Sequence, residues 1–322
     1  MSLLKTNRKQ NLTNLTSGYI LLDKPSGITS FDALQPFKKA LMTGKIGHTG
    51  TLDKFACGLL IILTGHALKL TNFFLHCDKR YEGVIRFGEE TDTLDPEGAV
   101  VYQCDVPTEN AVRAVLPQFT GAIMQEPPVF SALHIDGKRA SDLVRSGANV
   151  EMKARPVTIH SLELMSWEPP FAKITVHCSS GTYIRSLARD IGRAALSCGS
   201  LSSLRRTSVG GVSLEEGALT ISPDKRERLD PSVAHDAIKP VDKNVLAKIG
   251  LNSIDVPPAV AASMRYGKPL SQISGLPFSA AGLQDSVHAI FCQDELVAVI
   301  EKAENKMRYV FVNGAGSKIE IN

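Results

Sequence analysis

Alternation of apolar and polar residues predicts several strands along the chain. In the segment AKITVHCS, one face would carry Ala172, Ile174, Val176 and Cys178. Because successive side chains of a strand point to opposite faces, this segment is expected to be a half-buried strand. Strands are also predicted at residues 19–22 and in the segments YEGVIRFG and AVVYQCDV. The apolar run 59–63 is one that a folded protein would bury.

Helical periodicity begins a few residues after that half-buried strand. Apolar residues recur at i, i+3, i+4 and i+7, namely Ile184, Leu187, Ala188 and Ile191, which predicts an amphipathic helix. A second helix is predicted after Thr29 or Ser30 as its N-cap, and Pro36 should bend or end it.

The helix that begins near residue 184 carries a stripe of arginines, because Arg185, Arg189 and Arg193 are four residues apart. Such a stripe is usually solvated charge. Arg185, however, would lie in the first turn, where the helix dipole disfavours a cation. A carboxylate or a phosphate should offset this cost, and Asp53 is one candidate partner.

Composition is that of an ordinary soluble globular protein, with 43% hydrophobic and 21% charged residues. We find no apolar run near 18 residues, so no membrane span is expected. The six cysteines are scattered without a C-x-x-C pair and are predicted to be reduced thiols that hold no metal. They are Cys57, Cys77, Cys104, Cys178, Cys198 and Cys292.

Charge is distributed unevenly along the chain. Basic residues predominate over 1–80 and 181–210, and acidic residues predominate over 81–130. This segregation can form a basic face suited to phosphates, or the charges can cancel in three dimensions. The acidic loop EETDTLDPEG contains a strong turn signal. The spacing of Asp92, Asp95 and Glu97 does not match a calcium loop, so no calcium site is expected.

Segments at the two ends and near residue 230 indicate domain boundaries. Residues 1–17 are polar and are predicted to be a disordered tail. Residues 221–245 are charged, contain prolines and lack periodicity, which favours a linker. From about residue 246 the sequence predicts short strands in a small β-rich module.

Six motifs occur in order along the chain: GHTGTLD with a later GLL, KRYEG, GEETDTLDPEG, QEPPVFSA, CSSGTYIRSLARDIG and LRRTSVGG. The set resembles the bacterial TruB-type tRNA pseudouridine synthases, which isomerise the uridine at position 55 in the TΨC loop. The resemblance covers about residues 18–215. It implies an α+β fold, with a mixed, mostly antiparallel sheet flanked by helices and a small C-terminal PUA-like β module.

The same resemblance implies a domain division. Residues 18–245 would form the catalytic domain, with an RNA-gripping insertion at about 121–155, and residues 246–322 would form the PUA-like RNA-binding domain. Four positions depart from the family pattern: Lys54, Cys57, His134 and Ser141. Lys54 replaces a proline and so loses a rigid φ. The departures put RNA affinity or substrate range in question more than chemistry.

The resemblance implies four catalytic residues. Asp53 matches the essential aspartate, whose carboxylate can act as a nucleophile. Tyr81 matches the tyrosine that stacks on the target base, close to the proton removed from C5. Tyr183 and Arg185 match active-site residues, and Arg185 would pair with Asp53 and favour its ionised form. From the residues alone, Asp53 could instead be a helix N-cap, and both tyrosines could be ordinary core residues.

Further positions are implied for substrate binding. The uridine must be flipped out of its loop before chemistry, and His48 matches the histidine that fills the space it vacates. Leu204 matches an apolar pocket residue, and Lys24 and Pro25 match a supporting motif. Arg205 and Arg206 are predicted to contact phosphates, with plain solvated charge as the alternative.

The expected protein is therefore a stand-alone, cytoplasmic enzyme that needs neither metal nor cofactor. Its partner would be the T-arm of tRNA, and it would act as a monomer without a membrane or an obligate protein partner. One alternative is a non-catalytic tRNA-binding or tRNA-folding protein on the same scaffold. Another is a guide-RNA-dependent relative that resembles dyskerin and works inside a ribonucleoprotein.

Overall fold

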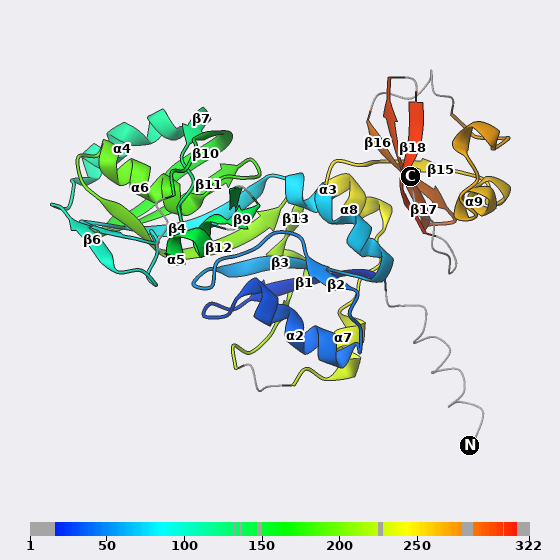
Figure 1. Cartoon of the computed structure of the whole chain (residues 1–322), viewed down its shortest axis with the longest axis horizontal. Coiled ribbons are helices and arrows are strands. Elements are labelled where there is room, and N and C mark those ends of the chain that lie inside the picture. The colour runs from blue at the N-terminus through cyan, green and yellow to red at the C-terminus, as the bar shows by residue number, and fades with distance from the viewer. Residues whose placement is uncertain are drawn as a thin grey trace.

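The larger part of the molecule is built on one mixed sheet (Figure 1). The computed structural model describes residues 17–131, 133–135, 137–146, 150–224, 228–278, 286–304 and 306–313. Within them the strand order is β14-β1-β3-β12-β4-β11-β10-β7, with β13 beside β12 and β2 beside β3. The strands are β1 (Gly18–Lys24), β2 (Ile46–His48), β3 (Cys57–Thr64), β4 (Lys79–Phe87), β7 (Gly121–Gln125), β10 (Arg155–Glu168), β11 (Phe171–Cys178), β12 (Gly199–Val209), β13 (Val212–Ser213) and β14 (Leu219–Thr220).

Two pairs in this sheet, β1 with β14 and β3 with β12, are parallel, and the other pairs are antiparallel. The predicted fold class is therefore confirmed. The apolar run 59–63 lies in β3, between β1 and β12. Leu60 and Ile62 pack into one hydrophobic core, and Leu59, Ile61 and Leu63 pack into a second core on the other face. Both faces of β3 are covered, which explains a continuous apolar run in place of alternation.

The helices are α2 (Ser30–Ala40), α3 (Thr71–His76), α4 (Glu109–Val115), α5 (Ala140–Arg145), α6 (Ile184–Ala194), α7 (Pro231–Asp236), α8 (Lys243–Lys248) and α9 (Pro258–Arg265). Short 3-10 turns cover η1 (Gly65–Leu70), η2 (Leu116–Phe119), η3 (Leu214–Glu216) and η4 (Leu270–Gln272). Across the described residues, no helix has the length and apolar character needed to cross a membrane.

The predicted half-buried strand and the helix that follows it are confirmed as β11 and α6, with the apolar positions of each buried. Helix α2 starts as expected, with Thr29 and Asp32 forming a capping box. The expected interruption at Pro36 is wrong in one respect, because the helix continues to Ala40. Burial of Phe37 in the core beneath offsets the hydrogen bond that proline cannot donate.

A small hairpin of β5 (Glu89–Thr91) and β6 (Val100–Gln103) carries the acidic loop, and β8 (His134–Ile135) pairs with β9 (Lys138–Arg139). The prediction that all cysteines are reduced thiols is wrong for two of them. Cys104 and Cys198 form a disulfide with Cα atoms 5.8 Å apart. Gly88 brings the two cysteines together, because its N–H donates to the Cys198 carbonyl and its carbonyl accepts from the Cys104 N–H.

The C-terminal module is a four-stranded sheet, ordered β15 (Asn252–Asp255), β16 (Val287–Cys292), β17 (Glu295–Ala303) and β18 (Lys306–Val312), with α9 beside it (Figure 1). The small β-rich module is thus confirmed. The second core continues into it, because Phe291, Val299 and Phe311 share a cluster with Tyr19 and Leu246.

The segment 221–245 differs from the linker that its composition suggested. It contains α7 and the start of α8, and Ala234 and Ile238 are buried in the first core. Tyr19 and Lys239 also exchange two backbone hydrogen bonds, at 2.9 and 2.8 Å. Asp224, Arg228, Asp230 and Asp236 are exposed within this packed segment, so its composition resembles that of a linker. Residues 1–16, most of the predicted tail, lie outside the described part of the chain.

Candidate active site

Asp53 lies in the loop between β2 and β3, and this loop is fastened to the turn before α2. The Ser30 hydroxyl accepts from the Leu52 N–H at 2.8 Å and donates to the Leu52 carbonyl at 3.0 Å. The Gly27 N–H donates to the Lys54 carbonyl at 2.8 Å. A strand, not a helix, follows the loop, so the alternative of Asp53 as a helix N-cap does not hold.

Arg185 faces Asp53 with two atoms of its guanidinium. Nε lies 2.9 Å from Oδ2 of Asp53, and Nη2 donates to Oδ1 at 3.2 Å. The Arg185 side chain is 6% exposed and that of Asp53 is 38% exposed, so the carboxylate remains reachable from solvent. The pair thus combines one charge-assisted hydrogen bond, from Nη2, with a close charge contact at Nε. The anionic partner that the helix dipole required is thus present, and it is a carboxylate.

The same guanidinium has three further partners that sequence reasoning missed. Nη1 lies 3.3 Å from Oδ2 of Asp95 and donates to the Thr93 carbonyl at 2.8 Å. Nη2 donates to the Phe130 carbonyl at 3.0 Å. Thr93 and Asp95 belong to the motif GEETDTLDPEG, whose place in the motif order was the signal that could have found them. The acidic loop therefore positions Arg185, and Arg185 positions Asp53.

The acids of this loop are engaged by groups of the protein. Oδ1 of Asp95 accepts from the Thr93 hydroxyl at 2.6 Å, and Oδ1 of Asp92 accepts from the Ala99 N–H at 3.0 Å. Glu97 accepts from Nζ of Lys54 at 2.6 Å. The loop thus supports the neighbouring Asp53 loop, a role that differs from cation binding.

The pKa of Asp53 is raised above its ordinary value, although Arg185 favours the ionised form as expected. Burial is the largest cause, and the nearby carboxylates of Asp95 and Glu97 add to it. The Arg185 guanidinium acts in the opposite direction. Charge pairing alone predicted a lowered pKa. Burial, together with the carboxylate of Asp95 on the same guanidinium, outweighs the effect of Arg185, so the net shift of the Asp53 pKa is upward.

An Asp95→Asn variant is expected to shift the acid limb of the pH–rate profile to lower pH. Asp95 raises the pKa of Asp53, so its neutralisation lowers that pKa and keeps Asp53 ionised in more acidic solution. The measurement is the single-turnover rate on tRNA from pH 5 to 8, with Asp92→Asn as the matched control in the same loop. A limb that stays in place, or moves to higher pH, would contradict this coupling.

Tyr81 and Leu204 lie on the adjacent strands β4 and β12 and pack in the same core. Tyr81 pairs across β12 with Arg206 and across β11 with Val176. Burial raises the pKa of Tyr81, while the Arg206 guanidinium lowers it. Its hydroxyl therefore keeps its proton at neutral pH. Leu204 is buried opposite Gly83, which has no side chain to fill the space beside it.

Tyr183 directly precedes α6, and Gln125 at the end of β7 holds its backbone. The Tyr183 N–H donates to Oε1 of Gln125 at 2.8 Å, and its carbonyl accepts from Nε2 at 3.1 Å. Burial raises the pKa of Tyr183, and the Arg185 charge is among the causes that lower it. Gln125 therefore fixes the start of the helix that carries Arg185. Sequence reasoning missed this residue.

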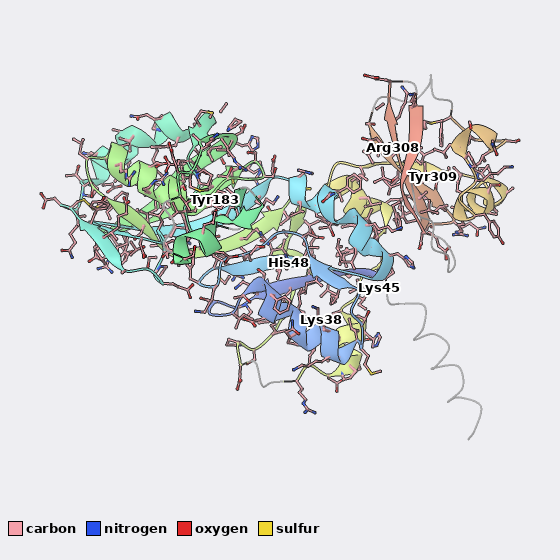
Figure 2. All side chains as sticks on the ribbon, viewed as in Figure 1. Lys38, Lys45, His48, Tyr183, Arg308 and Tyr309 are labelled. Atoms are coloured by element: carbon pink, nitrogen blue, oxygen red, sulfur yellow. A yellow bond between two sulfur atoms is a disulfide. The ribbon has the colours of Figure 1, made fainter. Side chains whose placement is uncertain are left out.

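His48 ends β2, directly before the Asp53 loop, and Lys24 ends β1, which pairs with β3. Figure 2 shows His48 beside α2 and Tyr183 in the lobe of β4, β10 and β11, so different parts of the sheet supply these residues. Burial and the Arg206 charge lower the pKa of His48, so its imidazole is neutral at pH 7. Lys24 is fully buried and donates to the carbonyls of Pro25 at 2.9 Å and Ile28 at 2.7 Å.

Burial lowers the pKa of Lys24 to about 8. Its two hydrogen bonds close the turn that precedes α2, and the same turn holds the Asp53 loop. A supporting role for Lys24 and Pro25 in the active site stays a prediction.

The prediction that Arg206 contacts phosphate is wrong. Its side chain is 2% exposed and donates to the carbonyls of Leu59 at 2.8 Å and Gly50 at 3.1 Å. It ties β3 and the Asp53 loop to β12 from inside. Arg205 faces the other side of the strand, is 40% exposed and pairs with Asp23 at 2.6 Å. It keeps a surface from which phosphate can be reached.

Among the departures from the family pattern, Lys54 and Cys57 are held by defined contacts. Lys54 forms an ion pair with Glu97, and Sγ of Cys57 accepts a hydrogen bond from Nη1 of Arg205 at 3.6 Å. A partly exposed ion pair therefore stands where the family has a rigid proline. His134 and Ser141 fall in β8 and α5, and their side chains lie outside the described part of the structure.

Comparison with known proteins places this geometry in a family. Residues 38–184 match the model of the TruB family pseudouridylate synthase N-terminal domain. The chain is 42% identical over 272 residues to tRNA pseudouridine synthase B of Aromatoleum aromaticum, covering 84% of each chain. It is 41% identical over 258 residues to the protein of the same name from an Azoarcus species, covering 80% of this chain and 84% of that one.

Among solved structures, a crystal structure of a Cbf5-Nop10-Gar1 complex contains a similar chain, with a TM-score of 0.66 and 25% identity. The match covers 94% of this chain and 85% of that one. The present chain belongs to the TruB family of pseudouridylate synthases.

Proposed function

We propose that this protein converts uridine 55 in the T-arm of tRNA to pseudouridine, with Asp53 as the catalytic carboxylate. The observation that carries the proposal is the Asp53–Arg185 ion pair. It joins the GHTGTLD and GTYIR motifs across 132 positions of sequence, and it leaves the carboxylate 38% exposed. The similarity to proteins named tRNA pseudouridine synthase B supports the same substrate.

The reaction is an isomerisation: the uracil leaves C1′, rotates, and rejoins through C5, which loses its proton. Asp53 can attack the base at C6, attack the sugar at C1′, or remove the 2′ proton to give a glycal. All three routes begin with an ionised carboxylate. Arg185 favours the ionised form of Asp53, and the backbone carbonyls of Thr93 and Phe130 keep its guanidinium in one orientation. Because the Asp53 carboxylate is already held in position, less conformational entropy is lost on reaching the transition state, and the reaction is faster.

The roles proposed for the other positions come from the resemblance to the family. Tyr81, with its protonated hydroxyl, stacks on the extruded base close to C5, and Leu204 forms the apolar wall beside it. Tyr183 is an active-site residue directly before α6, close in sequence to Arg185. His48 is neutral, so it can enter the space that the base vacates without carrying a charge into the stack.

We also propose that residues 18–245 form the catalytic domain, with an RNA-gripping insertion near 121–155, and that the C-terminal sheet is a PUA-like RNA-binding domain from about residue 246. Helix α8 crosses this boundary. The protein acts as a cytoplasmic monomer on tRNA. Recognition rests on the folded shape of the T-arm, and binding weakens with salt because phosphate contacts release counterions.

The test uses two unmodified tRNA transcripts labelled with tritium at C5 of uridine, one natural and one with cytidine at position 55. We expect the enzyme to release tritium from the first and none from the second. Filter binding of both transcripts provides the control. Binding without release would favour the non-catalytic tRNA-binding protein. Release from the second transcript would show that another uridine is the target.

A further inference from the structure

Three side chains suited to metal binding meet at one end of the large sheet, and none belongs to the site described above. They are Asp78, His160 and His177, and one ligand atom from each lies within 4.8 Å of the others. Nε2 of His160 lies 3.1 Å from Oδ2 of Asp78, and Nε2 of His177 lies 3.8 Å from the same oxygen. The two imidazole rings have centroids 4.6 Å apart.

A β-bulge produces this meeting. In the pairing of β10 with β11, Ile159 is opposite Cys178 and Ser161 is opposite His177, so His160 is the extra residue. A bulge re-aims the side chain of its extra residue, and here the imidazole of His160 lies against that of His177. Asp78 directly precedes β4, the strand beside β11, which begins at Lys79. The Gly210 N–H donates to the Asp78 carbonyl at 2.8 Å and fixes its backbone.

We propose that Asp78, His160 and His177 bind a divalent late transition-metal ion such as Zn²⁺, through both Nε2 atoms and a carboxylate oxygen. In a tetrahedral site with metal–ligand bonds of about 2.0–2.1 Å, neighbouring ligand atoms are about 3.4 Å apart. The distances from Oδ2 of Asp78 to the two Nε2 atoms, 3.1 and 3.8 Å, bracket that value. Imidazole and carboxylate are both zinc ligands.

The surroundings allow an ion to enter and to complete its coordination with water. The three side chains are between 24% and 43% exposed. Two cations lie nearby: Arg80 pairs with His177 across β4 and β11, and Lys79 interacts electrostatically with Asp78. The ion would join three strands at one end of the sheet, so its effect is on stability and not on isomerisation. The inference does not depend on the proposed function.

The test is titration of the full-length, tag-free, chelator-treated protein with Zn²⁺ by calorimetry, together with the melting temperature. We expect one site per chain and a higher melting temperature with the ion. Removal of an outer-shell partner already costs about 10–100-fold in metal affinity, so Asp78→Asn, His160→Gln and His177→Gln should each weaken binding at least about tenfold.

Two control variants separate this site from other ligands. His66→Gln removes an exposed histidine elsewhere on the chain, and Cys77→Ser removes the thiol adjacent to Asp78; both should bind Zn²⁺ as the wild type does. Melting temperatures in chelator show whether each variant is folded. Absence of binding to the wild type, equal binding by the three ligand variants, or loss of binding in Cys77→Ser would overturn the proposal.

Discussion

Asp53→Asn is expected to abolish tritium release from C5 while tRNA binding remains. The substitution keeps the shape of the side chain and removes the negative charge that each proposed route requires. The single-turnover rate should fall on the order of 10³-fold or more, as for the loss of an essential nucleophile or base. Folding should be preserved, since the Asp53 loop is held through the backbone of Leu52 and Lys54.

A matched control for this variant is Asp236→Asn, the same isosteric change at an exposed position in α7. Its rate and tRNA affinity should equal those of the wild type. If Asp53→Asn retained a tenth or more of the wild-type rate, another group would have to be the catalytic carboxylate. Loss of binding in parallel with the rate would place Asp53 in substrate binding instead.

Arg185→Gln is expected to lower the single-turnover rate more than the tRNA affinity. The rate should fall on the order of 10²-fold, because Asp53 loses both its orientation and a stabilising charge. The acid limb of the pH–rate profile should also move to higher pH. Arg185 lowers the pKa of Asp53, so its removal raises that pKa and leaves less ionised carboxylate at a given acidic pH.

The same variant should be less stable, by about 3 kcal/mol, because it leaves the carboxylates of Asp95 and Asp53 without their cation. We take the lower end of the usual range since Asp53 keeps contact with water. Arg113→Gln in α4 is the control, because Arg113 (51% exposed) and its partner Glu109 (41% exposed) both face solvent. Equal losses of rate and affinity in Arg185→Gln, or an acid limb that moves to lower pH, would contradict the positioning role.

Local pattern was sufficient to predict α6, which carries Arg185, and the strand β11 that precedes it. Alternation in β11 and the apolar period of α6 gave both elements, since each rule depends only on neighbouring residues. The dipole argument went further, because it required an anion beside Arg185. The identity of that anion came from resemblance, and the geometry agrees with it.

The errors concern partners far apart in sequence. Nothing near Cys104 indicates Cys198, which is 94 residues away. Asp95, which adds to the effect of burial in raising the pKa of Asp53, lies in a loop that no local rule connects to Asp53. For Arg206 a signal did exist. Two adjacent residues of a strand face opposite sides, so once LRRT was placed in a strand, Arg205 and Arg206 could not both reach solvent.

The second hydrophobic core runs from β1 and β3 through α8 into the C-terminal sheet without interruption. The active site and the C-terminal module would therefore bind RNA at a constant distance from each other. With the C-terminal module bound to one part of a tRNA, only a nucleotide at a matching distance could reach Asp53. The protein would then select its uridine by the distance of that nucleotide from the bound part of the tRNA, which gives positional accuracy without recognition of the bases in between.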